Sequence, residues 1–99
     1  MSTFLMLSTV GPDGAATLTE NPDRLKAVNA EVESMGVRVL AQWALLGPYD
    51  FCTVLDAPDE RAMAPLALVL GSRGTLKTLT LAAIPIDDYI EAVRNVSGD

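Results

Sequence analysis

The sequence predicts an α+β fold in which an antiparallel sheet carries helices on one face and a short C-terminal helix follows. Apolar segments of strand length alternate with segments whose apolar residues recur at three- and four-residue spacing. The halves also repeat one pattern, since NPDR at 21–24 and APDE at 57–60 each open a helix that ends at a glycine before a strand. The chain has 99 residues, so we treat 1–99 as a single domain.

The first third predicts a strand, a loop and a helix. Residues 3–9 are apolar on both alternating sides, which is typical of a strand that is covered on both faces. Residues 10–20 begin with Gly-Pro-Asp-Gly and predict a loop, with at most a short helical turn near its end. Asn21 is the expected cap of the following helix and Pro22 its first residue, and Gly36 ends it.

Two strands joined by a tight turn come next. Residues 37–45 alternate, with one face formed by Val37, Val39, Ala41, Trp43 and Leu45. Gly47 and Pro48 turn the chain, and residues 49–55 predict the third strand. That strand would begin with a phenol and a carboxylate, which is unusual for a segment that otherwise looks buried.

The last part predicts a helix, a strand and a terminal helix. The second helix begins at residue 56 or 57 and ends in the GSRG segment at 71–74. Pro65 predicts either a kink or a helix that effectively starts later. Residues 75–83 predict the fourth strand and 85–96 the terminal helix.

This order of elements is the split βαβ, or ferredoxin-like, arrangement, βαββαβ with one added helix. Its helices cover one face of the sheet, and the other face would need polar side chains that these strands do not supply. The composition is 49% hydrophobic, a large share for a chain too small to bury much apolar surface. We therefore expect a homodimer with the sheets face to face, a dimeric α+β barrel.

Charge and composition exclude several function classes. The net charge of −6 argues against nucleic acid and anionic membranes as partners. The chain has no histidine and one cysteine, Cys52, which excludes histidine-based triads, zinc sites of histidine and cysteine, and an intrachain disulfide. No cofactor and no metal are expected, because the acidic pairs at 59–60 and 87–88 stand where helices begin and complement the helix dipole. No apolar run approaches the length of a membrane helix, and we expect a cytoplasmic protein.

Six short segments together resemble the GYD domain family. They are FLMLST at 4–9, GAATL at 14–18, NPDRL at 21–25, LGPYD at 46–50, DAPDE at 56–60 and LALVLG at 66–71. Gly47, Tyr49 and Asp50 are the positions that match the family's motif, with Pro48 inserted between the first two. The resemblance covers nearly the whole chain and implies the ferredoxin-like fold, and it supplies no reaction.

The fold would place polar side chains from several elements at one end of the sheet. Asp50 is a candidate general base and Tyr49 a candidate hydrogen-bond donor to an oxyanion, so both are candidate catalytic residues. Ser8, Trp43 and Lys77 are candidate ligand-binding residues at the same end, although an indole also suits the core or a dimer interface.

A structural interpretation of the same residues competes with this one. Asp50 would accept hydrogen bonds from backbone amides of the loop after the first strand, or pair with Lys77. Tyr49 would be a core ring whose hydroxyl is satisfied at the edge. Gly47 and Pro48 shape the turn in either interpretation.

Three functions are compatible with these candidate residues and this composition. The first is a small homo-oligomeric module that binds a small organic molecule in a pocket near the turn between the second and third strands, or a protein partner. The second is a cofactor-independent enzyme, of monooxygenase, isomerase or cyclase type, on an aromatic or polyketide-like substrate; it rests on architecture alone. The third is a stress or regulatory protein without a pocket.

Overall fold

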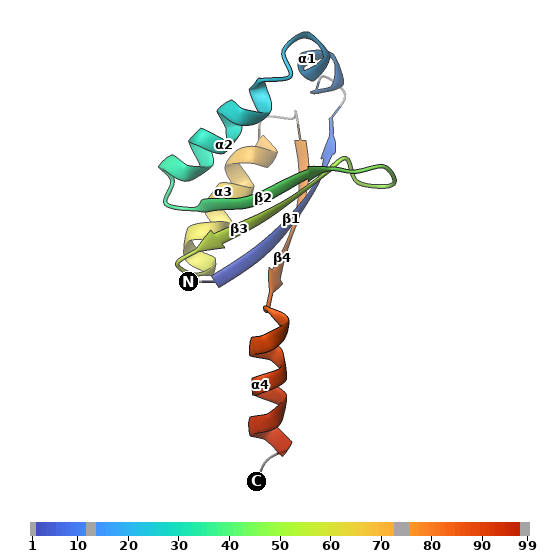
Figure 1. The fold of residues 1–99 in the computed structure, drawn as a ribbon. Coiled ribbons are helices and arrows are strands. Elements are labelled where there is room, and N and C mark those ends of the chain that lie inside the picture. Colours follow the sequence, from blue (N-terminus) through green and yellow to red (C-terminus); the bar gives the residue numbers. More distant parts are fainter. Residues whose placement is uncertain (1, 12–13, 73–75, 98–99) are drawn as a thin grey trace.

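The computed structural model describes residues 2–11, 14–72 and 76–97 (Figure 1). Its elements, in chain order, are β1 (Ser2–Val10), α1 (Gly14–Glu20), α2 (Arg24–Ser34), β2 (Arg38–Ala44), β3 (Phe51–Ala57), α3 (Glu60–Ser72), β4 (Leu76–Ala83) and α4 (Ile86–Ser97). Two of the predicted features fall on residues outside this description. They are the turn at 12–13 and the connection from the second predicted helix to the fourth strand at 73–75.

The four strands form one antiparallel sheet in the order β2-β3-β1-β4. The two central strands, β1 and β3, pair over seven residues, from Ser2 opposite Ala57 to Ser8 opposite Phe51. Helices α2 and α3 lie on the same face of this sheet (Figure 1). The expected α+β, ferredoxin-like fold is therefore confirmed.

The core lies between the sheet and these two helices. Leu55, Leu66 and Val37 are its largest fully buried side chains. They come from β3, α3 and the entry to β2, so the core joins distant parts of the chain. The rest of the buried apolar cluster is Phe4, Met6, Val32, Ala57, Met63 and Leu70.

A β-bulge changes which side chains of β2 face the helices. Val39 pairs with Leu55, but the register then shifts and Ala41 pairs with Val54. Because a bulge inserts one extra residue, every later side chain of the strand changes face. Trp43 therefore lies on the face away from the helices, and the expectation that it shares a face with Val39 was wrong.

Two helices also differ from expectation. Asp56 and Ala57 still belong to β3, because they pair with β1, and α3 begins at Glu60. Asp59 caps α3, since its Oδ1 accepts a hydrogen bond from the Ala62 amide at 3.1 Å. The segment expected to be mostly loop, 10–20, contains the seven-residue helix α1, whose Ala and Leu are good helix formers.

The second helix starts later than the Asn-Pro signal suggests. The Asn21 carbonyl accepts a hydrogen bond from the Arg24 amide at 3.1 Å, which makes a turn, and α2 begins at Arg24 after Asp23. Pro22 stands in that turn and not at the first helical position. A proline fits both places because its φ is the same in each.

The face of the sheet away from α2 and α3 is apolar in its centre. We call it the open sheet face. Strand alternation and register place eight apolar side chains there: Leu5, Leu7, Ala41, Trp43, Cys52, Val54, Leu79 and Leu81. No helix of the described chain covers it, and α4 extends away from the sheet beyond the end of β4 (Figure 1). Within the described residues, none of the helices is both long and apolar enough to span a bilayer.

The packing of α3 gives a direct test of the core. Leu66→Ala should lower the free energy of unfolding by about 2–5 kcal/mol, because it leaves a cavity at a fully buried site. Leu68→Ala on the exposed side of the same helix should change it by less than about 0.5 kcal/mol. Urea denaturation at one protein concentration measures both; equal losses would contradict the placement of α3.

Candidate functional site

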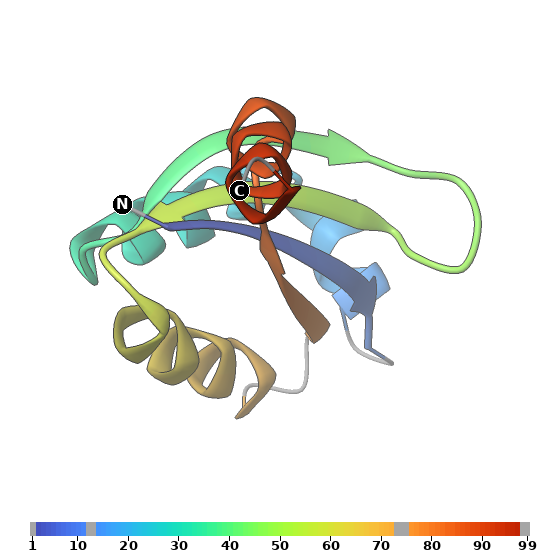
Figure 2. The same cartoon turned by 90° about the horizontal axis from the view of Figure 1, so that it is seen from below.

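The loop between β2 and β3 projects beyond the edge of the sheet (Figure 2). It comprises residues 45–50, and the Leu45 amide closes it by donating to the Asp50 carbonyl at 2.8 Å. Gly47 has a φ of 131°, a conformation that side-chain-bearing residues rarely adopt, so a glycine is required there. Leu46 at the tip is fully exposed.

The third strand begins at Phe51 and not at Tyr49 as expected. Gly47 and Pro48 delay the return of the chain to the sheet, so Tyr49 belongs to the loop and is half-buried. Asp50 is the residue through which the chain re-enters the sheet. Its position at the junction explains why a carboxylate precedes an apolar strand.

Asp50 ties the base of this loop to the end of β1. Its amide donates to the Ser8 carbonyl at 2.8 Å, and its Oδ2 accepts from the Val10 amide at 2.7 Å. Val10 is the last residue of β1, where the chain leaves the sheet. The expected bond from Asp50 to backbone at the start of 10–20 is confirmed, while catalytic roles for Asp50 and Tyr49 stay predictions.

The remaining candidate residues lie on different surfaces. Ser8 is buried and faces the helices. Trp43 and Lys77 face the open side, but they belong to β2 and β4, the two opposite edges of the sheet. The register places Lys77 beside Thr9, as expected for that end of the sheet. A single chain therefore does not gather Ser8, Trp43 and Lys77 around one ligand.

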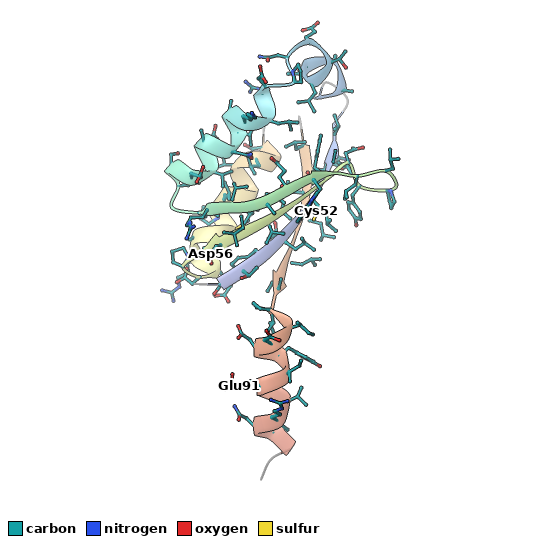
Figure 3. All side chains as sticks on the ribbon, viewed as in Figure 1. Cys52, Asp56 and Glu91 are labelled. Atoms are coloured by element: carbon teal, nitrogen blue, oxygen red, sulfur yellow. The ribbon has the colours of Figure 1, made fainter. Side chains whose placement is uncertain are left out.

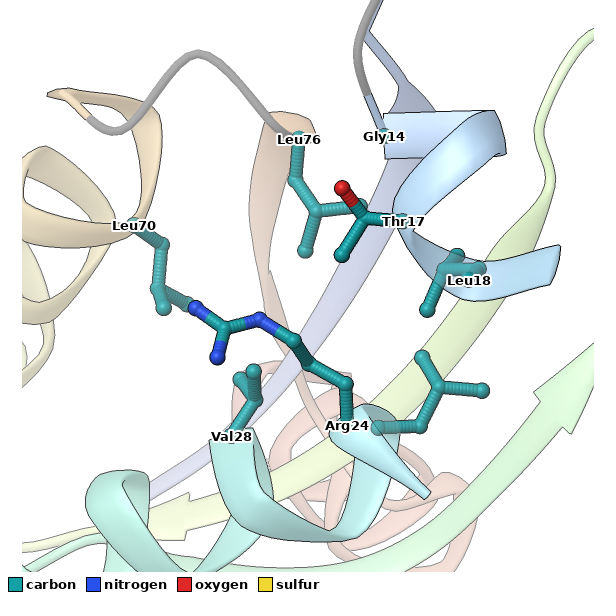
Figure 4. A pocket seen from close by; sticks show the side chains of 8 residues that line it. Gly14, Thr17, Leu18, Arg24, Val28, Leu70 and Leu76 are labelled. Atoms are coloured by element: carbon teal, nitrogen blue, oxygen red, sulfur yellow. The ribbon is translucent and has the colours of Figure 1, made fainter. Parts of the chain in front are cut away.

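Two small cavities lie between the helices and the sheet. The first has a volume of about 30 Å³ and is bordered by α1, α2 and α3, with the Arg24 side chain lying across it (Figure 4). The second has a volume of about 40 Å³ and shares Leu25, Val28, Leu70 and Leu76 with the first. Such volumes hold a few water molecules, whereas pockets for drug-sized ligands measure about 300–1,000 Å³.

A chain of polar side chains crosses the second cavity, and sequence reasoning missed it. Asn29 of α2 donates through Nδ2 to Gln42 Oε1 at 2.8 Å, and Gln42 Nε2 donates to Thr53 Oγ1 at 3.3 Å. Ser8 also lines this cavity. The bulge in β2 is the reason Gln42 faces the helices, and no strict alternation pattern reveals a bulge.

Within residues 2–11, 14–72 and 76–97, no group of three or more His, Cys, Asp or Glu side chains comes together. The polar groups at the loop base and in the second cavity instead hold one another through the hydrogen bonds described above. Of these groups, Asp50 holds the base of the loop against the end of β1.

Comparison with known proteins identifies the family. The model of the GYD domain matches residues 4–93. The chain belongs to the GYD domain family. One relative of this GYD domain protein comes from Thermus thermophilus and is named glutamine synthetase and cystathionine beta-lyase binding protein. The two chains are 53% identical over 95 residues. The match covers 95% of this chain and 100% of that protein.

The role of Asp50 in this GYD domain can be measured at one amide. Asp50→Ala should speed hydrogen exchange at the Val10 amide and cost about 1–3 kcal/mol of stability, because a partly buried donor loses its acceptor. Asp50→Asn keeps an acceptor oxygen and should lose less. NMR-detected exchange of the Val10 amide is the measurement; wild-type exchange in Asp50→Ala would show that the bond does not hold the end of β1.

Proposed function

We propose that this GYD domain protein is a non-enzymatic module that binds other proteins through the loop 45–50. Its relative is named for binding glutamine synthetase and cystathionine beta-lyase, and the two chains are 53% identical over 95 residues. The same two enzymes are therefore the first partners to test. The observation that carries the assignment to the loop is the fully exposed, apolar tip at Leu46.

The composition of the loop suits protein contact. The stretch Leu45-Leu46-Gly47-Pro48-Tyr49 has no charged residue, although the chain carries 13 acidic and 7 basic side chains. Residues 45–48 are exposed, so their apolar atoms are available to a partner. Contiguous apolar side chains on a projecting element mark interaction sites more often than single exposed leucines do.

The base of the loop is held, which favours binding. Three hydrogen bonds of 2.7–2.8 Å through Asp50 join Leu45, Ser8 and Val10. A loop that is already ordered loses less conformational entropy when it docks, so more of the contact energy remains as affinity. The polar residues at the end of the sheet thus support recognition by positioning the loop.

The small cavities weigh against catalysis on a large substrate. Neither cavity between the helices and the sheet is lined by Tyr49 or Asp50, and each holds only a few water molecules. A wider depression of about 650 Å³ beside α3 and β4 is open to solvent, and Lys77 lines it while Tyr49 and Asp50 do not. An enzyme that acts on an aromatic or polyketide-like molecule needs a concave site that encloses the substrate around its catalytic residues. Binding through a projecting loop needs none.

The loop assignment is tested with purified glutamine synthetase and cystathionine beta-lyase from the same organism. Leu46→Asp should weaken binding at least about 10-fold, because a charge would be buried in the contact. Leu68→Asp, at an exposed leucine of α3, is the matched control and should bind as the wild type does. Isothermal titration calorimetry measures both affinities.

Two results would contradict this proposal. Equal binding of Leu46→Asp and wild type would move the contact away from the loop. Failure of the wild type to bind either enzyme would remove the proposed partners. Circular dichroism of each variant checks that the fold is intact, which the exposed positions of Leu46 and Leu68 lead us to expect.

A small polar ligand is the second candidate, favoured by the hydrogen-bonding side chains around the second cavity. Ser8, Asn29, Gln42 and Thr53 line it, close to Phe51 at the loop base. A ligand there would have to be of the size of a few water molecules, or would have to move α2. Native mass spectrometry of freshly purified protein should then show an added non-covalent mass that Gln42→Leu removes. A mass identical to the bare chain in both proteins would exclude this candidate.

A further inference from the structure

Helix α4 stands apart from the rest of the described chain. Its side chains from 86 to 96 are exposed, and Figure 3 shows them projecting into open space around the helix, Glu91 among them. The radius of gyration is 15.5 Å, whereas a compact chain of this length has about 13 Å. The longest extent is 57 Å against 29 and 19 Å for the other two. The helix extends the molecule instead of packing on it.

The sequence of α4 is nevertheless that of a packed helix. Its apolar side chains recur at three- and four-residue spacing and form one stripe, which consists of Ile86, Tyr89, Ile90, Val93 and Val96. The charged residues Asp87, Asp88, Glu91 and Arg94 lie off this stripe. Since an isolated helix of 12 residues is marginal in water, α4 needs an apolar surface to be stable.

The open sheet face is such a surface, and it is also uncovered. Trp43 is 55% exposed, Leu79 44% and Leu81 42%. The register sets the side chains in two rows across the four strands. One row is Trp43, Cys52, Leu7 and Leu79, and the other is Ala41, Val54, Leu5 and Leu81.

The α4 of one chain does not cover the sheet of the same chain. Only Ile84 and Pro85 separate the end of β4 from the start of α4. Pro85 fixes its own φ and favours an extended conformation at Ile84, which directs the chain onward from β4. Figure 1 shows the result, in which α4 continues away from the body beyond β4. The stripe of α4 is therefore left exposed to another molecule.

We infer that a second copy of this chain covers the open sheet face and that the two copies exchange their α4 helices. A two-fold pairing brings the same patch of both copies together, and an apolar patch is complementary to itself. Each α4 would then pack with its stripe on the body of the partner. One symmetric assembly thereby buries both apolar surfaces that a single chain leaves exposed.

The area is adequate for a stable dimer. Four strands about 4.8 Å apart, with about 3.3 Å per residue over seven paired residues, make a face of roughly 440 Å². The stripe of α4, about 18 Å long and roughly 10 Å wide, adds about 180 Å². These are flat areas, and the accessible area of the side chains is larger. The sum approaches the value of about 800 Å² per partner of a standard interface.

The distribution of charge permits the contact between two acidic chains. The two apolar rows contain no charged residue, and the nearest charges, Arg38, Asp56 and Lys77, lie toward the ends of the strands. A net charge of −6 on each copy is thus kept out of the interface centre. No like charges would have to be buried against each other, which would weaken the association.

The test combines mass with the reactivity of Cys52, whose thiol lies in the middle of the open sheet face (Figure 3). Light scattering should give twice the chain mass for the wild type, and Cys52 should react slowly with a maleimide. Ile90→Glu should raise the dissociation constant of the dimer at least about 100-fold and speed the thiol reaction, because each dimer would bury two unpaired charges. Asn95→Glu, on the opposite side of α4, is the control and should behave as the wild type.

A second variant separates the two parts of the inference. Leu81→Glu places a charge in the centre of the open sheet face and should also give monomers. Ile90→Glu should leave the fold of each chain intact, because α4 does not pack on the body of its own chain (Figure 1).

A monomeric wild type, or a dimer that survives Ile90→Glu, would overturn the inference. So would a Cys52 thiol that reacts freely in the wild type and becomes protected only when a partner enzyme is added.

The proposal of a dimer and the proposal of binding through the loop 45–50 can be contradicted independently of each other. Leu46 lies on the loop and not on the open sheet face, so Leu46→Asp should keep the mass of a dimer while binding is lost. A dimer that binds neither enzyme would contradict only the proposed function.

Discussion

The controlling constraint in this protein is that its sheet is apolar on both faces while the chain provides helices for one. Helices α2 and α3 bury Phe4, Met6 and Leu55 on the inner side. On the outer side, strands β1 and β4 place Leu5, Leu7, Leu79 and Leu81 in register with no described element above them. A hydrophobic contribution of about 25 cal/mol per Å² makes such a face costly to leave in water. The core, the extended α4 and the expected self-association all follow from this imbalance.

The turn between β2 and β3 is the second organising feature. Its glycine permits the positive φ, and its aspartate bonds the loop at both sides of its base. Asp50 contacts backbone of β1, which is central in the sheet, so the loop is supported by a strand that is paired on both sides. The residues that suggested chemistry in the sequence thus have a geometric role that is independent of any reaction.

Patterns that repeat along the chain allowed the fold to be predicted. The strand β4 and the stripes of α3 and α4 follow periods of two and 3.6 residues, and those periods survive in the structure. The bulge in β2 could not be predicted, because its cause is the pairing with β3 and not a local signal. The bulge places Trp43 on the open face and Gln42 on the helix side. The strict alternation used in the sequence analysis therefore assigned both side chains to the wrong faces.

Local signals failed where two of them competed. Asn21 and Pro22 are good residues for both a helix start and a turn, and the structure uses them for the turn. Asp59 and Glu60 correctly indicated the start of α3. The strand β3 nevertheless extends to Ala57, because β1 is long enough for Ser2 to pair with that residue. The bonding of Asp50 to backbone amides after the first strand was predictable, since a carboxylate beside strand ends meets free amides, but the sequence did not single out Val10 as the donor.

A symmetric dimer would also alter what the loop can do. Each copy would contribute one loop 45–50, so the assembly would present two identical apolar tips at a fixed separation. An enzyme that is itself a symmetric oligomer offers its binding surface more than once. If one dimer engages two such surfaces, the second contact is intramolecular and the avidity exceeds the affinity of a single loop by a factor of about 10²–10⁴. A contact as small as one loop tip could then hold a large enzyme, and the coverage of the sheet would be the structural basis of that gain.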